Sequence, residues 1–302
     1  METAAIKTST IQTAAIQTAR IEPLDAPLGA RVEGLDRAAP WDAQTSLAVQ
    51  QAFLDHHILL FPGVCMEPRD VLAFARRFGE PISEVNREKR LGEIPEVSRL
   101  DSTIKAIEKD KDLLFDQQSA LRNEGWHSDQ SFVERPAKAT ILHAHEVPSR
   151  GGATWFCNTA GAYDALPEEK KQRLAGLMAV HGYDTRRARY RPAVRSQAEI
   201  DETPDVIHPL VRTHPESGRK VLFLNLNRLD RILGLERAES DALLDELAAW
   251  VTQERFVYRH QWSVGDVLVW DNRCTMHRVS YDSPAGDRRI MYRVVTQGDR
   301  PY

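Results

Sequence analysis

The sequence predicts a mainly β fold with flanking helices, of the β-sandwich or jelly-roll type. Short apolar runs that suit strands recur through the second half of the chain, whereas helical spacing is confined to a few segments. No stretch rich in Pro, Gly and Ser divides the chain. We therefore expect a single domain from residue 21 to residue 302, preceded by a disordered tail over residues 1–20.

The first half of this domain is expected to contain short strands and two helices. An alternating stretch at 21–36, punctuated by Gly and Pro, predicts two strands. Asp42 can cap a helix that runs to about His57. The apolar run ILLFPG at 58–63 predicts a buried strand that ends at Pro-Gly, and PRDVLAFARRFG at 68–79 predicts an amphipathic helix.

Residues 80–125 lack periodicity and are rich in charged side chains, so we expect a long excursion over the surface. Long loops in compact domains are usually lids, binding loops or disordered segments. Beyond this excursion, helices are expected at 160–176 and 238–253. Strands are expected at 139–146, 153–157, 177–183, 206–213, 220–225, 256–262, 266–270, 275–280 and 288–296.

Composition and charge exclude several classes of protein. The chain has 302 residues, 42% of them hydrophobic, which is enough for a substantial core. A net charge of −4 provides no basic field for nucleic acid or an anionic membrane, and no apolar run approaches the ~20 residues that cross a bilayer. The three cysteines are few and odd in number, as in a reduced protein. We therefore expect a cytoplasmic protein with no nucleic-acid or membrane partner, and we expect it to form a homo-oligomer.

The stretch EGWHSDQSF at 124–132 contains two candidate metal ligands, His127 and Asp129. On an extended strand, side chains two residues apart point to the same face. Two histidines and one carboxylate form the facial triad of non-haem Fe(II) sites, which leaves open coordination positions. His277, in VLVWDNRCTMHRVSYD, follows a strand and a turn and is the candidate third ligand.

Other interpretations of these histidines stay open on the residues alone. A His-x-Asp pair occurs often by chance and also suits the polar edge of a strand. A second pair, His143 and His145, could project two imidazoles from one strand, although partly exposed histidines on a sheet are the stronger interpretation. The protein could also be a zinc hydrolase or a non-catalytic jelly roll with a structural metal.

The segment DRRIMYR at 287–293 places Arg289, Met291 and Arg293 on one face of a strand. An unpaired buried charge costs several kcal/mol, whereas a guanidinium group binds a carboxylate through two hydrogen bonds. Two inward arginines therefore indicate a site that receives anions, and an exposed basic strand edge is the alternative.

The motifs WHSDQSF, VPSRGGATWF, HPLVRTHPESGRKVLFLN and WDNRCTMHR…DRRIMYR follow one another along the chain. With these motifs, the chain resembles the taurine/2,4-dichlorophenoxyacetate dioxygenase family of Fe(II)- and 2-oxoglutarate-dependent oxygenases, closer to the aryloxyalkanoate branch. The resemblance covers the chain from about residue 21 to its end. It implies a double-stranded β-helix (jelly-roll) core in which His127, Asp129 and His277 bind Fe(II).

The resemblance also implies where the co-substrate binds. Thr154, in GGATWF, and Arg289 would hold the distal carboxylate of 2-oxoglutarate, and Arg293 would lie near the substrate anion and the keto-acid end. The implied reaction uses O2 and 2-oxoglutarate to hydroxylate a small organic anion next to a heteroatom, and it releases succinate and CO2. An aryloxyalkanoate would then be cleaved at its ether bond.

The stretch FGEPISEVNREKR departs from the taurine-specific members of that family. Those members place a histidine and a tyrosine where this chain has Glu84 and Arg87, so an aryloxyalkanoate is favoured over taurine or another alkylsulfonate. Arg87, Lys89 and Arg90 are candidates to bind a substrate carboxylate, with solvated surface charge as the alternative. Asn123 matches a family position near the substrate, with a turn as the alternative.

Overall fold

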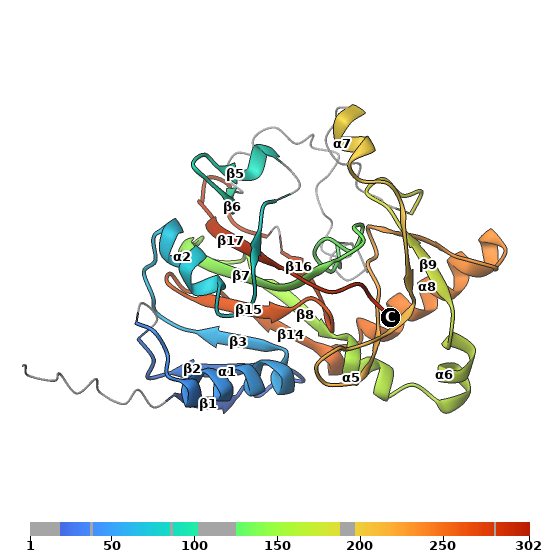
Figure 1. Cartoon of the computed structure of the whole chain (residues 1–302), viewed down its shortest axis with the longest axis horizontal. Helices are drawn as coiled ribbons and strands as arrows, with labels where there is room; N and C mark the ends of the chain where they lie inside the picture. Colours follow the sequence, from blue (N-terminus) through green and yellow to red (C-terminus); the bar gives the residue numbers. More distant parts are fainter. Residues whose placement is uncertain (1–18, 37–38, 85–86, 102–124, 188–196, 281) are drawn as a thin grey trace, which may run out of the picture.

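The computed structural model describes residues 19–36, 39–84, 87–101, 125–187, 197–280 and 282–302. Most regular structure in these residues is β-strand, and helices flank the sheets (Figure 1). This confirms the expected mainly β fold. Most of the predicted tail lies outside the described residues, and Arg20, its last residue, already begins a strand.

In the described part of the chain, the largest sheet has nine strands. Its strands are β1 (Arg20–Pro23), β2 (Ala30–Glu33), β3 (Ile58–Phe61), β4 (Pro81–Ile82), β5 (Arg90–Leu91), β6 (Ile94–Asp101), β7 (Ala137–Glu146), β15 (Val267–Asp271) and β17 (Ile290–Gln297). Their order is β1-β2-β3-β15-β7-β17-β6-β5, and β4 pairs with the end of β17. The central β17 therefore lies between β7 on one side and β6 and β4 on the other.

A second, smaller sheet faces the large one. Its order is β14 (Val257–His260), β8 (Thr154–Asn158) and β16 (Thr275–Val279). Phe156 of β8 packs in one buried cluster with Leu142 of β7, Trp270 of β15 and Met291 of β17. Because apolar side chains from both sheets share this core, the arrangement is a jelly roll, as predicted.

Two further small sheets and several helices cover the outside. The sheets consist of β9 (Met178–His181), β10 (Val206–Pro209) and β13 (Leu229–Ile232), and of β11 (Val211–Thr213) and β12 (Lys220–Leu222). The helices are α1 (Ala43–His56), α2 (Pro68–Ala75), η1 (Arg87–Lys89), α5 (Thr159–Asp164), α6 (Glu168–Leu174), α7 (Gln197–Asp201), α8 (Arg237–Val251) and η3 (Glu254–Phe256).

The helices pack through apolar side chains on opposite sides of the jelly roll. The cluster that joins α1 and α2 to the large sheet includes Phe53, Phe61 and Phe74, whereas α6 and α8 join the small sheet through a separate cluster. In Figure 1, α1 and α2 accordingly lie beside the large sheet, and α6 and α8 lie at the other end of the molecule. Asp42 caps α1 as predicted, because its Oδ1 accepts a 2.6 Å hydrogen bond from the backbone N of Thr45.

The expected surface excursion at 80–125 was wrong over its described middle part. Residues Ile94–Asp101 form β6, which pairs with β17 from Ile290 to Val294. Burial along β6 does not alternate, so the segment carries no period-two pattern that could predict a strand. The strand exists because β17 offers it a free edge, which is a tertiary effect.

The expected helix at 160–176 is two helices, and the expected strand at 206–213 is two strands. Pro167 lies between α5 and α6: it has no N–H with which to continue α5, and it is the N-cap residue of α6. The strands β10 and β11 belong to different sheets, because β10 pairs with β9 whereas β11 pairs with β12. Neither α7 nor β13 was predicted from the sequence.

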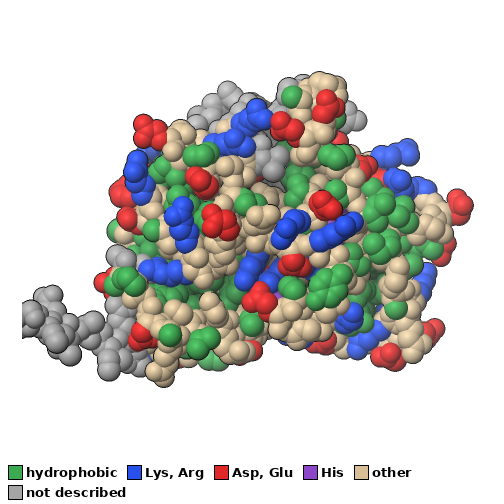
Figure 2. All heavy atoms as spheres, in the orientation of Figure 1, with side chains coloured by type: hydrophobic (Ala, Val, Ile, Leu, Met, Phe, Trp, Pro, Cys, Tyr) green, Lys and Arg blue, Asp and Glu red, His purple; other side chains and the backbone are tan. Residues whose placement is uncertain are grey.

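On the face seen in Figure 2, acidic and basic side chains are interspersed, and neither charge dominates.

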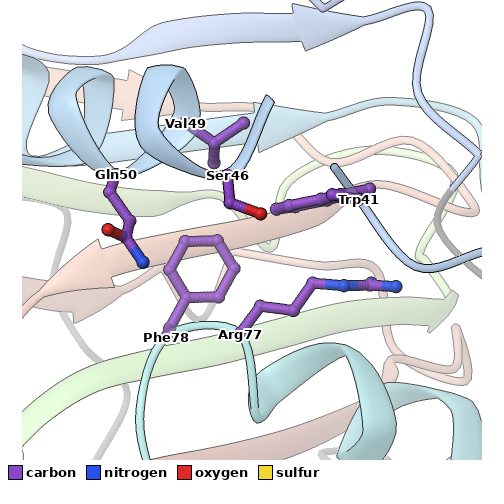
Figure 3. A pocket seen from close by; sticks show the side chains of 6 residues that line it. All are labelled: Trp41, Ser46, Val49, Gln50, Arg77 and Phe78. Atoms are coloured by element: carbon purple, nitrogen blue, oxygen red, sulfur yellow. The ribbon is translucent and has the colours of Figure 1, made fainter. Parts of the chain in front are cut away.

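A cavity of about 280 Å³ lies between α1 and the end of α2 (Figure 3), lined by Trp41, Ser46, Val49, Gln50, Arg77 and Phe78. No predicted site residue lines this cavity. Among the described residues, no helix is long and apolar enough to cross a membrane.

Candidate metal centre and co-substrate site

His127 and His277 are positioned by a direct backbone contact. The backbone N of His127 donates to the carbonyl O of His277 over 3.0 Å, and the backbone N of His277 donates back to His127 over 2.8 Å. This isolated antiparallel bridge joins His127 to the middle of β16, on the edge of that strand that β8 does not occupy. It places the two imidazole rings 4.1 Å apart, centroid to centroid.

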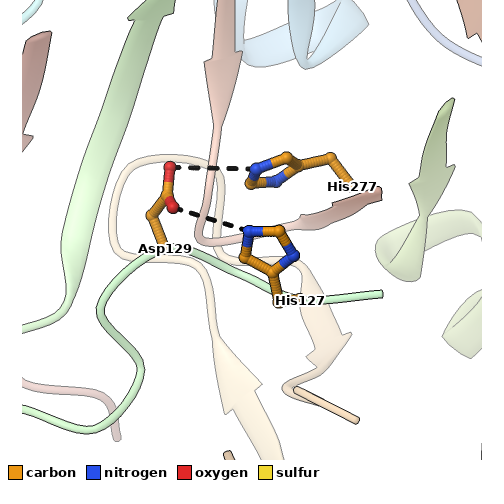
Figure 4. Close-up of side chains that lie close together, drawn as sticks. All are labelled: His127, Asp129 and His277. Atoms are coloured by element: carbon orange, nitrogen blue, oxygen red, sulfur yellow. Dashed lines mark ion pairs between the residues drawn. The ribbon is translucent and has the colours of Figure 1, made fainter. Parts of the chain in front are cut away.

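Asp129 faces both imidazoles (Figure 4). The Nε2 atom of His127 lies 3.8 Å from Asp129 Oδ1, and the Nε2 atom of His277 lies 3.9 Å from Asp129 Oδ2. These separations are too long for direct hydrogen bonds, and all three candidate ligand atoms lie within 4.8 Å of one another. The geometry therefore leaves space for one cation between them.

The surroundings of both imidazoles suit metal ligation. His127 Nδ1 lies 2.8 Å from the carbonyl O of Gly125 and can donate to it, which leaves the Nε2 lone pair for a metal. Burial of His277 lowers its pKa well below the usual value, so its imidazole is neutral near pH 7. The donor set of two imidazole nitrogens and one carboxylate fits Fe(II) with open coordination positions.

A network of buried hydrogen bonds orients the Asp129 carboxylate. The hydroxyl of Thr140 donates to Asp129 Oδ2 over 2.6 Å, and Asn272 Nδ2 donates to that hydroxyl over 2.8 Å. Asn272 Oδ1 in turn accepts from the backbone N of Asp129 over 3.2 Å and from Trp270 Nε1 over 3.0 Å. Neither Thr140 nor Asn272 was predicted as a site residue, although Asn272 lies in the motif WDNRCTMHR.

Arg293 lies beside the predicted metal centre, held between two carboxylates. Its Nη1 donates to Asp129 Oδ1 over 3.3 Å, and its Nη2 forms an ion pair with Glu84. The Nε of Arg293 is buried and has no partner among the described residues. Burial lowers the pKa of this guanidinium to about 10, so it stays charged near neutral pH.

Arg289 and Thr154 meet between the two sheets, close to the start of β17. Arg289 is buried; its Nε donates to the carbonyl O of Gly152 over 3.2 Å, and its Nη2 lies 3.5 Å from Thr154 Oγ1. The Thr154 hydroxyl also accepts from Trp262 Nε1 over 2.9 Å. Gly152 has φ +64, and a Cβ there would lie 3.3 Å from Cδ of Arg289, so glycine permits this close approach.

The structure does not bring the other predicted substrate residues to the metal centre as a group. Arg90 Nε donates to the backbone O of Glu84 over 2.8 Å, so it supports the loop that carries Glu84. Arg87 forms an exposed 3.0 Å ion pair with Glu202, and Lys89 is half-buried with a partner of its own. Asn123 lies outside the described residues.

Two other clusters of candidate ligands have structural roles. His143 Nε2 lies 2.8 Å from the carbonyl O of Val64, and its ring stacks on Tyr292 with 6° between the planes. In a second cluster, Asp271 accepts hydrogen bonds from His214 at 3.0 Å and from Arg273 at both carboxylate oxygens, at 2.8 and 2.7 Å. The Arg273 guanidinium therefore already binds both oxygens of the Asp271 carboxylate, which a metal ion in this cluster would need as a ligand.

Comparison with known proteins places this arrangement among characterised dioxygenases. The family model described as "Taurine catabolism dioxygenase TauD, TfdA family" matches residues 20–295. The chain is 35% identical to the alpha-ketoglutarate-dependent 2,4-dichlorophenoxyacetate dioxygenase of Cupriavidus pinatubonensis, a match that covers 92% of this chain and 97% of that protein. It is 36% identical to the (S)-phenoxypropionate/alpha-ketoglutarate-dioxygenase of Sphingobium herbicidovorans, covering 92% and 95%. The crystal structure of a taurine dioxygenase from Burkholderia xenovorans superposes with a TM-score of 0.78 at 30% identity, covering 94% and 90%.

Proposed function

Because this chain belongs to the TauD/TfdA family, it is an Fe(II)- and 2-oxoglutarate-dependent dioxygenase, and we propose that it hydroxylates an aryloxyalkanoate next to the ether oxygen. The meeting of His127, Asp129 and His277 around one cation-sized space carries the proposal. The names of the two relatives that are 35% and 36% identical support the substrate class. The proposal includes a single dioxygenase domain over residues 21–302, in agreement with the family match over residues 20–295.

Each site residue has a proposed role that follows from its contacts. His127, Asp129 and His277 would hold Fe(II), which supplies the redox chemistry that couples 2-oxoglutarate decarboxylation to substrate hydroxylation by O2. Arg289 and Thr154 would bind the distal carboxylate of 2-oxoglutarate, because a buried guanidinium and a hydroxyl there offer charge-assisted hydrogen bonds. Arg293 would attract the carboxylate of the substrate.

The proposed reaction accounts for all atoms of O2. One oxygen atom enters the substrate at the carbon next to the ether oxygen, and the other enters succinate as 2-oxoglutarate loses CO2. The hydroxylated carbon carries two oxygen substituents, so the product is a hemiacetal. This hemiacetal breaks into a phenol and an oxo acid, which cleaves the ether.

A comparison of substrates tests the proposal. Purified protein with Fe(II), 2-oxoglutarate and O2 is assayed for succinate in the presence of 2,4-dichlorophenoxyacetate, 2-phenoxypropionate, taurine or hexanesulfonate. We expect the aryloxyalkanoates to stimulate succinate release most, with one phenol formed per succinate. Stimulation by the sulfonates alone would replace the aryloxyalkanoate proposal with taurine or alkylsulfonate oxidation, which the similarity to a taurine dioxygenase supports.

The homo-oligomer and the cytoplasmic location expected from the sequence stay predictions. Light scattering after size-exclusion chromatography tests the oligomeric state.

A further inference from the structure

The Arg293 guanidinium is already occupied by carboxylates of the protein itself. Its two terminal nitrogens donate to Asp129 and to Glu84. The Glu84 and Arg293 side chains are only 10% and 12% exposed, so solvent screens this ion pair little. A substrate anion that approaches Arg293 therefore meets a cation whose two terminal nitrogens each already bind a carboxylate of the protein.

The pairing of β4 with β17 brings Glu84 to this position. Ile82 and Pro81 of β4 pair with Val295 and Thr296 of β17. β4 ends at Ile82, two residues before Glu84, and Arg293 lies two residues before Val295 on β17, where the β17 backbone pairs with Ser98 of β6. Arg90 Nε donates to the backbone carbonyl of Glu84, which holds the Glu84 backbone close enough for its carboxylate to reach Arg293.

The two carboxylates on Arg293 differ in how readily they can leave. Asp129 is fixed by Thr140 and by a backbone hydrogen bond to Asn272, and it is a candidate metal ligand. The described contacts of the Glu84 carboxylate are with Arg293 alone, and Glu84 lies in the segment between β4 and η1, outside any helix or strand. A substrate carboxylate has the same chemistry as Glu84 and can replace it on Arg293 without leaving the guanidinium unpaired.

We propose that Glu84 is a specificity-determining residue that competes with the substrate carboxylate for Arg293. This inference rests on the proposed function, in which Arg293 attracts the substrate anion. Binding is then an exchange of one carboxylate for another. A small anion with no apolar group gains too little binding free energy from this exchange to displace Glu84. An anion with an aromatic ring also gains free energy from the burial of that ring.

The test measures ligand binding without turnover. Protein loaded with Mn(II) and 2-oxoglutarate in the absence of O2 is titrated calorimetrically with phenoxyacetate and with its uncharged analogue phenoxyacetamide. We expect Glu84→Gln to lower the dissociation constant of phenoxyacetate about ten-fold and to change that of phenoxyacetamide less than about two-fold. Glu84→Ala is a second variant, and Glu93→Gln, a change at an exposed glutamate nine residues further along the chain, is the matched control that should leave both constants unaltered.

A parallel titration with hexanesulfonate and hexanol separates the exchange from the proposed substrate class. If hexanesulfonate gains affinity in Glu84→Gln while phenoxyacetate binds neither protein, the exchange holds and the aryloxyalkanoate proposal fails. If Glu84→Gln and Glu84→Ala, both folded by circular dichroism, bind every anion no better than the unaltered protein, the exchange is wrong.

Discussion

His127 and His277 exchange two backbone hydrogen bonds, of 3.0 and 2.8 Å, although they are 150 residues apart along the chain. The positions of the two imidazoles relative to each other therefore depend on main-chain pairing and not on side-chain contacts. Asp129 completes the cluster because it follows His127 by two residues and its carboxylate points to both rings. It follows that side chains in this cluster can be altered without removing the contact that assembles it.

Substitution of His127 by alanine should abolish metal binding but keep the fold. The variant retains the backbone bridge to His277 and loses one of three proposed ligands. We expect the visible charge-transfer absorption of the anaerobic complex with Fe(II) and 2-oxoglutarate to disappear, with the melting temperature of the metal-free protein within about 5 °C of the unaltered value. His145→Ala, at an exposed histidine, is the control. A charge-transfer band of full intensity in His127→Ala would remove His127 from the proposed ligand set.

Loss of the Thr140 hydroxyl should weaken metal binding through Asp129. Thr140→Val removes the 2.6 Å hydrogen bond that orients the carboxylate, and outer partners of this kind typically change metal affinity about 10- to 100-fold. Titration with Mn(II), followed by the loss of its free electron paramagnetic resonance signal, measures the effect. Thr296→Val is a matched control, because this buried hydroxyl bonds the backbone of Ala139 instead. Equal Mn(II) affinities in the two variants would show that Thr140 acts on stability alone.

Arg289→Gln should raise the concentration of 2-oxoglutarate needed for half-maximal turnover about 10- to 100-fold, because a charge-assisted hydrogen bond is lost. The maximal rate should change much less if Arg289 only binds the co-substrate. The neighbouring Arg288 is half-exposed and pairs with Glu146 over 3.3 Å, so Arg288→Gln is the matched control. A normal requirement for 2-oxoglutarate in Arg289→Gln would contradict the proposed role.

The sequence predicted the parts of this site that depend on local spacing and on recognisable motifs. His127 and Asp129 are two residues apart, and the alternation in DRRIMYR predicted that Arg289, just before β17, and Arg293, within it, share a face, so these candidates could be named from the chain alone. The contacts of Glu84 with Arg293 and of Thr140 with Asp129 could not, because they are side-chain contacts that form only in the folded chain. For the same reason β6 was missed, since pairing with β17 and not a period-two pattern makes it a strand.

The stability of the protein should fall as the pH is lowered from about 6.5 to about 4, partly because His57 is buried in its neutral form. Burial lowers the pKa of His57 from 6.5 to about 4, with the charge of Asp271 opposing the shift. Within this window the unfolded chain binds a proton at His57 that the folded chain does not, so stability rises with pH by up to about 1.4 kcal/mol per pH unit for this group. His57 has φ 65, a left-handed conformation that asparagine adopts more readily than most residues, so His57→Asn removes the titrating group with little backbone strain. Urea unfolding at pH 7 and pH 5 should show a smaller loss of stability in His57→Asn than in the unaltered protein, and an equal loss would assign the acid sensitivity to other groups.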